Sequence, residues 1–422
     1  MRVLLIGGGG REHALGWKLA QSSLLETLIS CQGNPGLAEL GDVVLDVDPT
    51  DPEAIVELCA ERNIDLVVVG PEAPLAAGIA DALMDAETPV FGPTRSGARL
   101  ESSKSFAKEV MAGAGVPTAA SATFSDRESA VLHLKDSPGP YVVKADGLAA
   151  GKGVLVTDSI KDAIGWVDDC LGGKFGEAGS SVLIEDYLDG PELSIFYICA
   201  DREAIPLQPA RDYKRLFDGD KGPNTGGMGS FSPVENLDAD LVDWTTLNVV
   251  LPTLAELASR DVDYTGFLYV GLILTNDGPR VLEFNCRLGD PETEVLMPLI
   301  TSDLLVVLHA AATVGIGDHS VTWSDQAAVD VVLAAPGYPE SPETGLAISG
   351  LEPFSDALVF HSGTRETDDG LVTAGGRVLN VVGLGRSVGE ARERAYDAAR
   401  RIDFAGKQFR SDIAADTAGG VG

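Results

Sequence analysis

The chain of 422 residues is 45% hydrophobic, which is enough to build two to four domains that each bury a core. Its formal net charge of −33 excludes a basic surface that could neutralise nucleic-acid phosphates, so no nucleic-acid partner is predicted. No apolar run approaches the roughly 20 residues that a membrane helix needs, and we expect no membrane partner.

The five cysteines are scattered along the chain and form no C-x-x-C pair. This spacing argues against a zinc cluster and favours reduced thiols, so a cytoplasmic protein is predicted. Acidic residues outnumber basic ones by 64 to 31 and fall evenly along the chain. Such a surface suits a cytoplasm of high salt concentration, and an ordinary acidic bacterial enzyme is the alternative.

The first region, residues 1–103, alternates apolar runs with amphipathic segments. "RVLLIG" and "IDLVVVG" are continuous apolar runs bounded by glycine, as buried parallel strands are, and "PVFGP" is a short third run. Between them, "REHALGWKLAQS" and "DPEAIVELCAERN" carry apolar residues at helical spacing. The pattern predicts a parallel βαβ sheet with helices on both faces.

The second region, residues 104–320, begins with a helix in "ESSKSFAKEVMAGAGVPTA". The strands "YVVKADG", "GVLVTD" and "SSVLIEDYLDGPELSIFYICAD", with a turn at residues 190–191, predict a small antiparallel α+β unit. The following stretch, "ARDYKRLFDGDKGPNTGGMGSFSP", is rich in glycine and charge, and loops of that length in compact domains are usually functional or disordered. The strands "GFLYVGLILT" and "RVLEFNCR" come next.

The third region, residues 325–422, is predicted to be rich in β-strands. "AAVDVVLAA", "ALVFHSG" and "LVTAGGRVLNVVGLG" read as strands, and "VGEARERAYDAARRI" reads as a final helix. Few of its residues are candidates for chemistry. The whole chain therefore predicts a multidomain protein of mixed α/β and α+β class.

The stretch "YVVKADGLAAGKGV" has the composition of a phosphate-binding loop but not the spacing of a P-loop. Gly147 stands four residues before Gly151, and Lys152 is followed by Gly153 where the P-loop has a hydroxyl residue. The glycines allow a close approach of backbone N–H groups to an anion, and Lys144 adds charge at the end of a strand. We predict phosphate binding; a surface hairpin with solvated lysines is the alternative.

The stretch "VLEFNCRLGDPETE" is a candidate metal site. Side chains alternate along a strand, so Glu283 and Asn285 share one face, and Arg287 continues it. A carboxylate and an amide oxygen are ligands that suit Mg²⁺, and a guanidinium can hold a phosphoryl oxygen. Phe284 and Cys286 point the other way, as if to a core, which argues against an edge strand with its polar face in water.

The stretch "EDYLDGPE" is a candidate nucleotide pocket. Glu185 and Glu192 flank a short connector that contains Leu188. The backbone of such a connector can hydrogen-bond an adenine edge, and an acid can meet the ribose hydroxyls. Taken alone, the stretch fits a charged hairpin better than a nucleotide pocket.

These stretches, in this order, resemble the ATP-grasp superfamily and, within it, the phosphoribosylamine–glycine ligases. The resemblance runs from end to end and includes "GGGGREHAL", "VVGPEAPLAAG", "FGPT", "KADGLAAGKGV", "GPNTGGMGSFSP", "YTGFLYVGL", "EFNCRLGDPET" and "GGRVLNV". It implies a Rossmann-like substrate domain over residues 1–103, known as a pre-ATP-grasp domain. It also implies an ATP-grasp domain over residues 104–320, with a lid subdomain at about 120–190, and a small β-rich domain over residues 325–422.

The resemblance implies an ATP-dependent ligase of de novo purine biosynthesis with Mg²⁺ or Mn²⁺ as cofactor. In this family glycine is phosphorylated by ATP, and the amine of 5-phosphoribosylamine attacks the glycyl phosphate to give glycinamide ribonucleotide. Catalysis then needs positioning and charge neutralisation but no protein nucleophile. The partners are small-molecule substrates, and a monomer or weak dimer is expected. "FLYVGLIL" offers no further acidic ligand, which leaves a second metal site open.

The resemblance also assigns roles to individual residues. Those implied to contact ATP phosphates are Lys104, Lys144, Gly147, Gly151, Lys152 and Gly153, and those implied to line the adenosine pocket are Glu185, Leu188 and Glu192. The implied metal ligands are Glu283 and Asn285, and the implied catalytic residues are Arg287, Lys144, Asp212 and Lys214. Those implied to touch 5-phosphoribosylamine are Gly9, Gly10, Glu72, Asp212, Lys214, Gly289 and Asp290, with the helix after "GGGG" facing the sugar phosphate.

Three other functions fit parts of the sequence. A Rossmann dehydrogenase would use "RVLLIGGGGREH", but Glu12 stands where the third glycine of G-x-G-x-x-G belongs after Gly7 and Gly9. Another ATP-grasp enzyme, such as a biotin-dependent carboxylase subunit or a formate-using purine enzyme, would share the nucleotide motifs. A regulatory module that binds nucleotide without turnover would not need the acid, amide and arginine on one strand.

Overall fold

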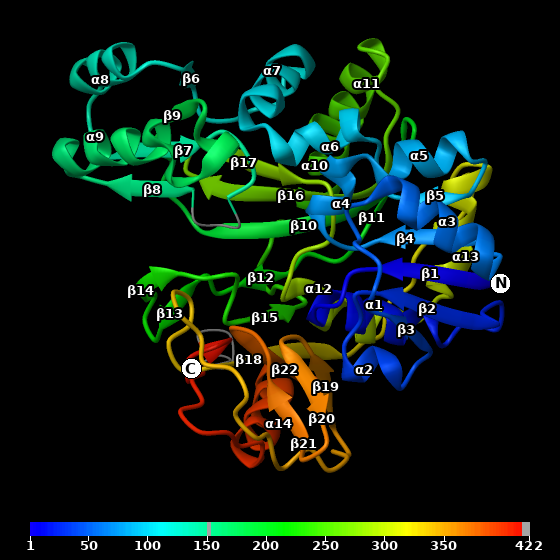
Figure 1. Cartoon of the computed structure of the whole chain (residues 1–422). Helices are drawn as coiled ribbons and strands as arrows, with labels where there is room; N and C mark the ends of the chain where they lie inside the picture. Colours follow the sequence, from blue (N-terminus) through cyan, green and yellow to red (C-terminus); the bar gives the residue numbers. More distant parts are fainter. Residues whose placement is uncertain (150–152, 416–422) are drawn as a thin grey trace.

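The structure is a computed structural model that describes residues 1–149 and 153–415 (Figure 1). Four sheets of four or five strands and two small hairpins are present in these ranges. No helix in the described part of the chain is long and apolar enough to cross a membrane. The mixed α/β class predicted from the sequence is confirmed.

The N-terminal sheet contains five parallel strands in the order β3-β2-β1-β4-β5. Its strands are β1 (Arg2–Ile6), β2 (Thr27–Cys31), β3 (Asp42–Val44), β4 (Leu66–Val69) and β5 (Val90–Phe91). Its helices are α1 (Gly10–Leu19), α2 (Pro35–Ala38), α3 (Pro52–Arg62), α4 (Glu72–Ala77) and α5 (Ile79–Asp85). The parallel sheet was predicted, and β2 and β3 are additional strands. The strand order reverses direction between β1 and β4, which is where open parallel sheets bind ligands.

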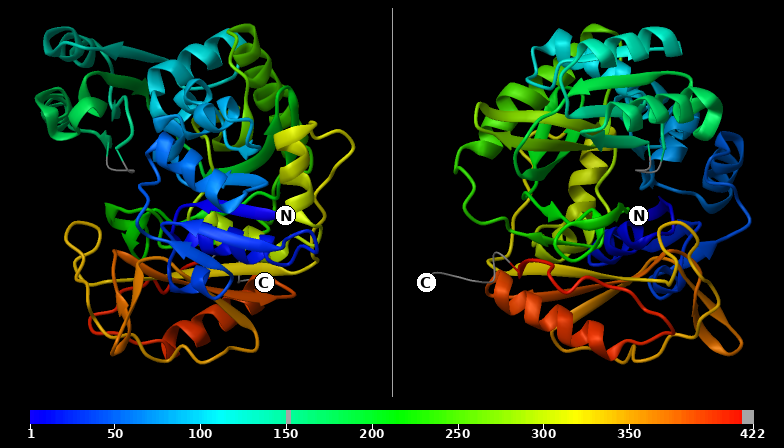
Figure 2. Two further views of the ribbon diagram at one scale, coloured as in Figure 1. Left: turned by 45° about the vertical axis from the view of Figure 1, so that its right-hand side comes forward. Right: turned by 90° about the vertical axis from the view of Figure 1, so that its left-hand side faces the viewer.

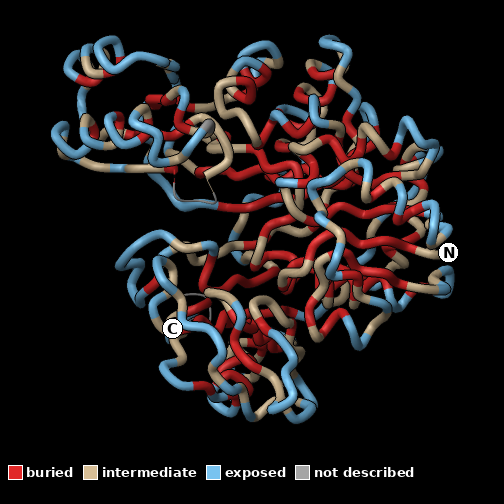
Figure 3. The backbone as a smooth tube through the Cα atoms, in the orientation of Figure 1, coloured by how far each residue is buried: buried red, intermediate tan, exposed pale blue. Residues whose placement is uncertain are grey.

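The central sheet is antiparallel, in the order β11-β10-β16-β17. Its strands are β10 (Glu192–Ala200), β11 (Glu203–Pro206), β16 (Thr265–Thr275) and β17 (Gly278–Asn285). The neighbouring helices are α6 (Arg95–Ser102), α7 (Lys104–Ala114), α10 (Leu241–Thr245), α11 (Leu251–Ser259), α12 (Glu292–Leu296) and α13 (Leu304–Thr313). Successive residues of β16 enter different cores: Leu268 packs in one and Phe267 in the other. The central sheet is therefore buried on both faces (Figure 3).

A small separate sheet in the order β6-β9-β7-β8 projects from this body (Figures 1 and 2). Its strands are β6 (Ser121–Phe124), β7 (Tyr141–Ala145), β8 (Val154–Thr157) and β9 (Val182–Asp186), and its helices are α8 (Arg127–Asp136) and α9 (Ile160–Asp169). The predicted turn at residues 190–191 does not join two strands of this sheet. It leads from β9 to β10, which belongs to the central sheet, so the connector crosses between the two.

The C-terminal sheet is antiparallel, in the order β12-β15-β18-β22-β19. Its strands are β12 (Arg211–Asp212), β15 (Gly229–Ser232), β18 (Ala327–Ala334), β19 (Ala357–His361) and β22 (Arg377–Gly385), and α14 (Val388–Arg401) packs on it. The hairpins are β13 (Arg215–Phe217) with β14 (Lys221–Asn224), and β20 (Thr364–Thr367) with β21 (Gly370–Thr373). The glycine-rich stretch before residue 234 thus supplies two strands to the sheet of the C-terminal region.

Candidate functional site

Two cavities of about 360 and 620 Å³ adjoin each other where the sheets meet. Both are lined by Lys144, Glu185, Asp212, Lys214 and Glu283, so they form one continuous cleft. The small sheet supplies Lys144 and Glu185 to one side of the cleft, and α7 adds Lys104 and Lys108. The central sheet with the loop after β17 supplies acids and an arginine to the other side. The cleft has the size of a nucleotide or cofactor site.

Most of the residues selected from the sequence line this cleft. They are Glu72, Lys104, Lys144, Gly153, Glu185, Leu188, Glu192, Asp212, Lys214, Glu283, Asn285, Arg287, Gly289 and Asp290. Three others do not line either cavity: Gly9, Gly10 and Gly147. The remaining two, Gly151 and Lys152, lie outside the described residues. The structure therefore brings together segments that are more than 200 residues apart in the sequence.

The first turns of α1 and α4, which carry Arg11 and Glu72, form the wall of the cleft at the switch point of the N-terminal sheet. Glu72 begins α4 and lines the cleft. Gly9 precedes α1, and its backbone N–H donates to Glu12 Oε2 at 2.8 Å. A Cβ on Gly10 would lie 2.2 Å from Nδ2 of Asn380, so side chains of the C-terminal region already fill the space over this glycine. The first turn of α1 is thus packed against β22.

A bulge in β17 sets the side chains of the candidate metal site. Gly271 pairs with Glu283 and Leu272 pairs with Val281, so Leu282 is an extra residue in the ladder. The bulge shifts the alternation by one residue. Val281 is therefore in the core, and both Leu282 and Glu283 face the cleft. Sequence alternation alone does not reveal this shift.

Arg287 is held by two carboxylates. Its Nη2 lies 2.7 Å from Oε1 of Glu101, and its Nε lies 3.4 Å from Oε2 of Glu72. Nη2 also donates to Oδ1 of Asn285 at 3.3 Å. Burial by itself lowers the pKa of Arg287, but the two carboxylates raise it above its ordinary value, so the group stays charged. Arg287 thus presents a fixed positive charge beside Asn285.

A carboxylate between two lysines forms the opposite side of the cleft. Glu185 on β9 lies 2.6 Å from Nζ of Lys144 through Oε2 and 3.0 Å from Nζ of Lys108 through Oε1. Lys104 donates from Nζ to the carbonyl oxygen of Gly147 at 2.9 Å. Burial lowers the pKa values of Lys104 and Lys108, because removing water disfavours their charged forms. Anionic oxygens of a ligand in the cleft would stabilise the charged forms of these two lysines.

Asp212, Lys214 and Glu292 form a further group of charges in the cleft. Nζ of Lys214 lies 2.6 Å from Oδ1 of Asp212 and 3.1 Å from Oε2 of Glu192. Burial, together with the nearby Asp212, raises the pKa of Glu292 to about 7. Glu292 is 4% exposed and accepts a hydrogen bond from the Ser194 hydroxyl at 3.2 Å. A carboxyl group poised in this way can give or take a proton near neutral pH.

Sequence reasoning missed several residues of the cleft: Arg11, Glu101, Lys108, Glu292 and Arg377. Two of these residues lie in stretches that the sequence had already marked as functional: Arg11 follows "GGGG", and Glu292 follows "GDP". A glutamate and a lysine on helices, such as Glu101 and Lys108, carry no local signal that separates them from surface residues. Arg377 lies in the region where few candidates were expected.

The donor set at the end of β17 fits a divalent cation. The Glu283 carboxylate accepts no hydrogen bond and forms no ion pair with any described residue, and the amide oxygen of Asn285 lies beside it on the strand. Within the described ranges, no group of three or more His, Cys, Asp and Glu side chains could hold a metal by itself. A cation here would also need oxygens from phosphates or water, which is the usual arrangement for Mg²⁺.

Comparison with known proteins agrees with this architecture over its whole length. The chain is 47% identical over 414 residues to the phosphoribosylamine–glycine ligase of Rhizobium meliloti, which covers 98% of each protein. The chain belongs to this family. Family models of three phosphoribosylglycinamide synthetase domains match successive segments of the chain. They are the N domain at residues 1–101, the ATP-grasp (A) domain at 102–293 and the C domain at 328–416. The ligase of Streptomyces coelicolor is also 47% identical, over 425 residues, or 99% of this chain and 100% of that protein.

Solved structures show the same fold. The crystal structure of phosphoribosylamine–glycine ligase from Thermotoga maritima matches with a TM-score of 0.86 and 38% identity, over 98% of this chain and 100% of that one. A biotin carboxylase domain from Hydrogenobacter thermophilus matches with a TM-score of 0.74 but only 18% identity, over 97% of this chain and 91% of that one. The second likeness concerns the fold alone.

Proposed function

We propose that this chain joins glycine to 5-phosphoribosylamine at the expense of ATP, giving glycinamide ribonucleotide, ADP and phosphate in de novo purine biosynthesis. The observation that carries the proposal is the 47% identity to a phosphoribosylamine–glycine ligase over nearly the whole chain. The cleft supports it chemically, since lysines face a carboxylate and an amide across one continuous space. An ATP-grasp ligase needs that combination to hold a nucleotide and a cation.

The carboxylate of glycine is a poor electrophile, so the reaction begins by making it a better one. A glycine oxygen attacks the γ-phosphorus of ATP, the bond to the β-phosphate oxygen breaks, and glycyl phosphate and ADP form. Lys104 and Lys144 are proposed to neutralise charge on the phosphates, with Arg287 steadying the transferred group. Glycines 147 and 153, with Gly151 and Lys152 between them, are proposed to complete the phosphate contacts.

The second step forms the amide. The amine of 5-phosphoribosylamine attacks the carbonyl carbon of glycyl phosphate, the bond to the phosphate oxygen breaks, and the amine loses a proton. We propose that Asp212, Lys214, Gly289 and Asp290 surround the phosphoribosylamine, with Gly9, Gly10 and Glu72 on the N-terminal side. Glu292 is proposed to take the proton, because it lines the cleft and burial raises its pKa to about 7.

The lining of the cleft supports a place for the nucleotide and another for the cation. Glu185, Leu188 and Glu192 are proposed to surround the adenosine, because they line the larger cavity at the connector between β9 and β10. Glu283 and Asn285 are proposed to hold Mg²⁺ or Mn²⁺, which neutralises phosphate charge when bound. The chain is further proposed to divide into domains at residues 1–103, 104–320 and 325–422, and to act in the cytoplasm as a monomer or weak dimer.

The test is release of ADP, measured with a coupled assay in the presence of glycine and freshly prepared 5-phosphoribosylamine. We expect turnover that requires both substrates, and a loss of at least about 100-fold in kcat for Glu283→Ala. Asp277→Ala is the matched control, because Asp277 is exposed in the turn that leads into the same strand. ADP release that needs bicarbonate or formate and ignores glycine would assign the chain to another ATP-grasp reaction.

A further inference from the structure

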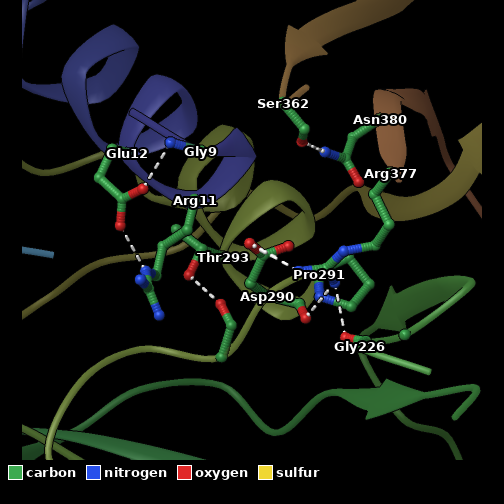
Figure 4. Close-up of polar contacts among 12 residues, drawn as sticks. Gly9, Arg11, Glu12, Gly226, Asp290, Pro291, Thr293, Ser362, Arg377 and Asn380 are labelled. Carbon is green, nitrogen blue, oxygen red and sulfur yellow. Dashed lines mark hydrogen bonds and ion pairs between the residues drawn. The ribbon is translucent and has the colours of Figure 1, made fainter. Parts of the chain in front are cut away.

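An arginine from the C-terminal region reaches into the cleft and holds the loop after β17. Arg377 is the first residue of β22, and its side chain is 19% exposed (Figure 4). Its Nη1 donates to the carbonyl oxygen of Asp290 at 2.7 Å and to that of Gly226 at 2.6 Å. Its Nη2 lies 3.0 Å from Oδ2 of the Asp290 side chain. One side chain thus joins three parts of the chain.

The backbone around this guanidinium leaves no room for other side chains. A Cβ on Gly226 would lie 2.9 Å from the guanidinium carbon of Arg377, and a Cβ on Gly227 would lie 2.4 Å from Cδ of Pro291. The N–H of Gly226 donates to the hydroxyl of Tyr338 at 2.9 Å, which ties the same turn to the C-terminal region. The "TGG" segment (residues 225–227) therefore packs directly against Arg377 and the "GDP" loop (residues 289–291).

The ion pair with Arg377 leaves the second carboxylate oxygen of Asp290 without a hydrogen-bond partner among the described residues. Oδ2 is bound to Arg377, whereas Oδ1 is shielded from solvent and has no hydrogen-bond partner among the described residues. Asp290 lines the cleft, and its carboxylate faces the start of α1, where a Cβ on Gly9 would lie 3.7 Å from Oδ2. A buried acceptor without a donor is costly unless a ligand, or a protonated carboxyl beside it such as Asp330, supplies the donor.

We infer that Arg377 is a positioning residue for the amine substrate: by binding Oδ2 of Asp290 it aims Oδ1 at an N–H or O–H donor of the phosphoribosylamine. This inference rests on the proposed function. Arg377 already donates to two carbonyls and contacts the carboxylate of Asp290, and in this inference it acts on the substrate through Asp290. The aim matters because a shift of about 1 Å in a positioning group can cost about 100-fold in rate.

The experiment measures steady-state kinetics for each substrate in Arg377→Met, Arg377→Lys, Asp290→Asn and the double variant Arg377→Met/Asp290→Asn. For Arg377→Met we expect kcat/KM for 5-phosphoribosylamine to fall about 100-fold, whereas the KM values for ATP and glycine change less than about threefold. Arg377→Lys should recover part of the loss, because an ammonium can still reach one oxygen. The double variant should be no worse than Asp290→Asn alone, since the two residues act as one unit.

Arg386→Met is the matched control, because Arg386 follows the other end of the same strand, is 91% exposed and should leave the kinetics unchanged. Losses that multiply in the double variant would mean that Arg377 contacts the substrate directly, and would overturn the inference. Equal losses for all three substrates would mean a general structural role, and would overturn it too. If the wild-type protein shows no turnover with 5-phosphoribosylamine, the proposed function fails first, which separates the two outcomes.

Discussion

The two sides of the cleft are built very differently. The small sheet, which carries Lys144 and Glu185, has a core of nine buried residues among those described. The acidic side rests on the central sheet, whose core on one face alone contains 38 buried residues and is shared with the N-terminal sheet. The figures agree, since the small sheet projects outward from the body (Figures 1 and 2).

This contrast predicts that the two sides of the cleft differ in mobility. Segments with few buried contacts open locally at lower free energy than a large shared core. The small sheet, which carries Lys144 and Glu185, is therefore expected to open and close, and the side built on the central sheet is expected to stay fixed. Closure of such a part excludes water and completes the site.

The largest expected effect comes from the fixed side. Glu101 is 9% exposed, binds Arg287 at 2.7 Å and accepts the N–H of Cys286 at 2.8 Å. Glu101→Leu leaves that N–H and most of the arginine charge unpaired, so we expect the free energy of unfolding to fall by about 4 kcal/mol. Denaturant titration measures it. Glu109→Leu, at an exposed position on α7, should change it by less than about 0.5 kcal/mol.

A pair of core substitutions tests the contrast directly. Leu134 on α8 and Leu268 on β16 are both fully buried, one in the small core and one in the large core. Each change to alanine should cost about 3 kcal/mol. We expect Leu268→Ala to lower the unfolding midpoint of the whole body, and Leu134→Ala to melt the small sheet in a separate, earlier transition. A single shared transition for both variants would show that the two parts unfold as one.

Nucleotide should restrain the small sheet more than the body. We predict that the subdomain at about 120–190 is a lid, so proteolytic nicking between residues 147 and 153 should slow about tenfold with saturating ATP and a divalent cation. Mass spectrometry of the fragments reports the position and rate. The wild-type protein with ATP but without the cation is the control, and a rate unaffected by the complete ligand would remove the lid from the mechanism.

The smallest expected effect on stability concerns Asp330, a fully buried acid on β18. Burial, and then the nearby Asp290, raises the pKa of Asp330 well above its ordinary value. The folded protein therefore keeps a proton that the unfolded chain releases above about pH 4, and stability is lost as the pH rises. Asp330→Asn cannot lose a proton, so it should be more stable than the wild type by about 1 kcal/mol at pH 8 and should reduce the slope, to which the buried Glu294 still contributes. Asp325→Asn, exposed just before β18, should leave the slope unchanged.

Much of the fold could be predicted because its signals are local. The runs "RVLLIG" and "IDLVVVG" are apolar on both faces, and a strand of that kind is stable only inside a sheet that is covered on both faces, as parallel sheets are. Short strands such as β3 and β12 have no such signal, because two or three residues show no periodicity. Which sheet β10 joins was also hidden, since the turn at 190–191 looks the same whether the next strand returns or crosses over.

The sequence by itself determined the family, the class of fold and most of the predicted residues that line the cleft. These features depend on glycines, lysines and paired oxygen ligands at fixed spacing, and each such pattern lies within one short segment of the chain. Tertiary structure alone decided which charges meet. The bulge that turns Glu283 inward, the carboxylate of Glu101 behind Arg287 and the arginine of β22 on the "GDP" loop arise from contacts between segments that are far apart in the chain, with no local pattern to mark them.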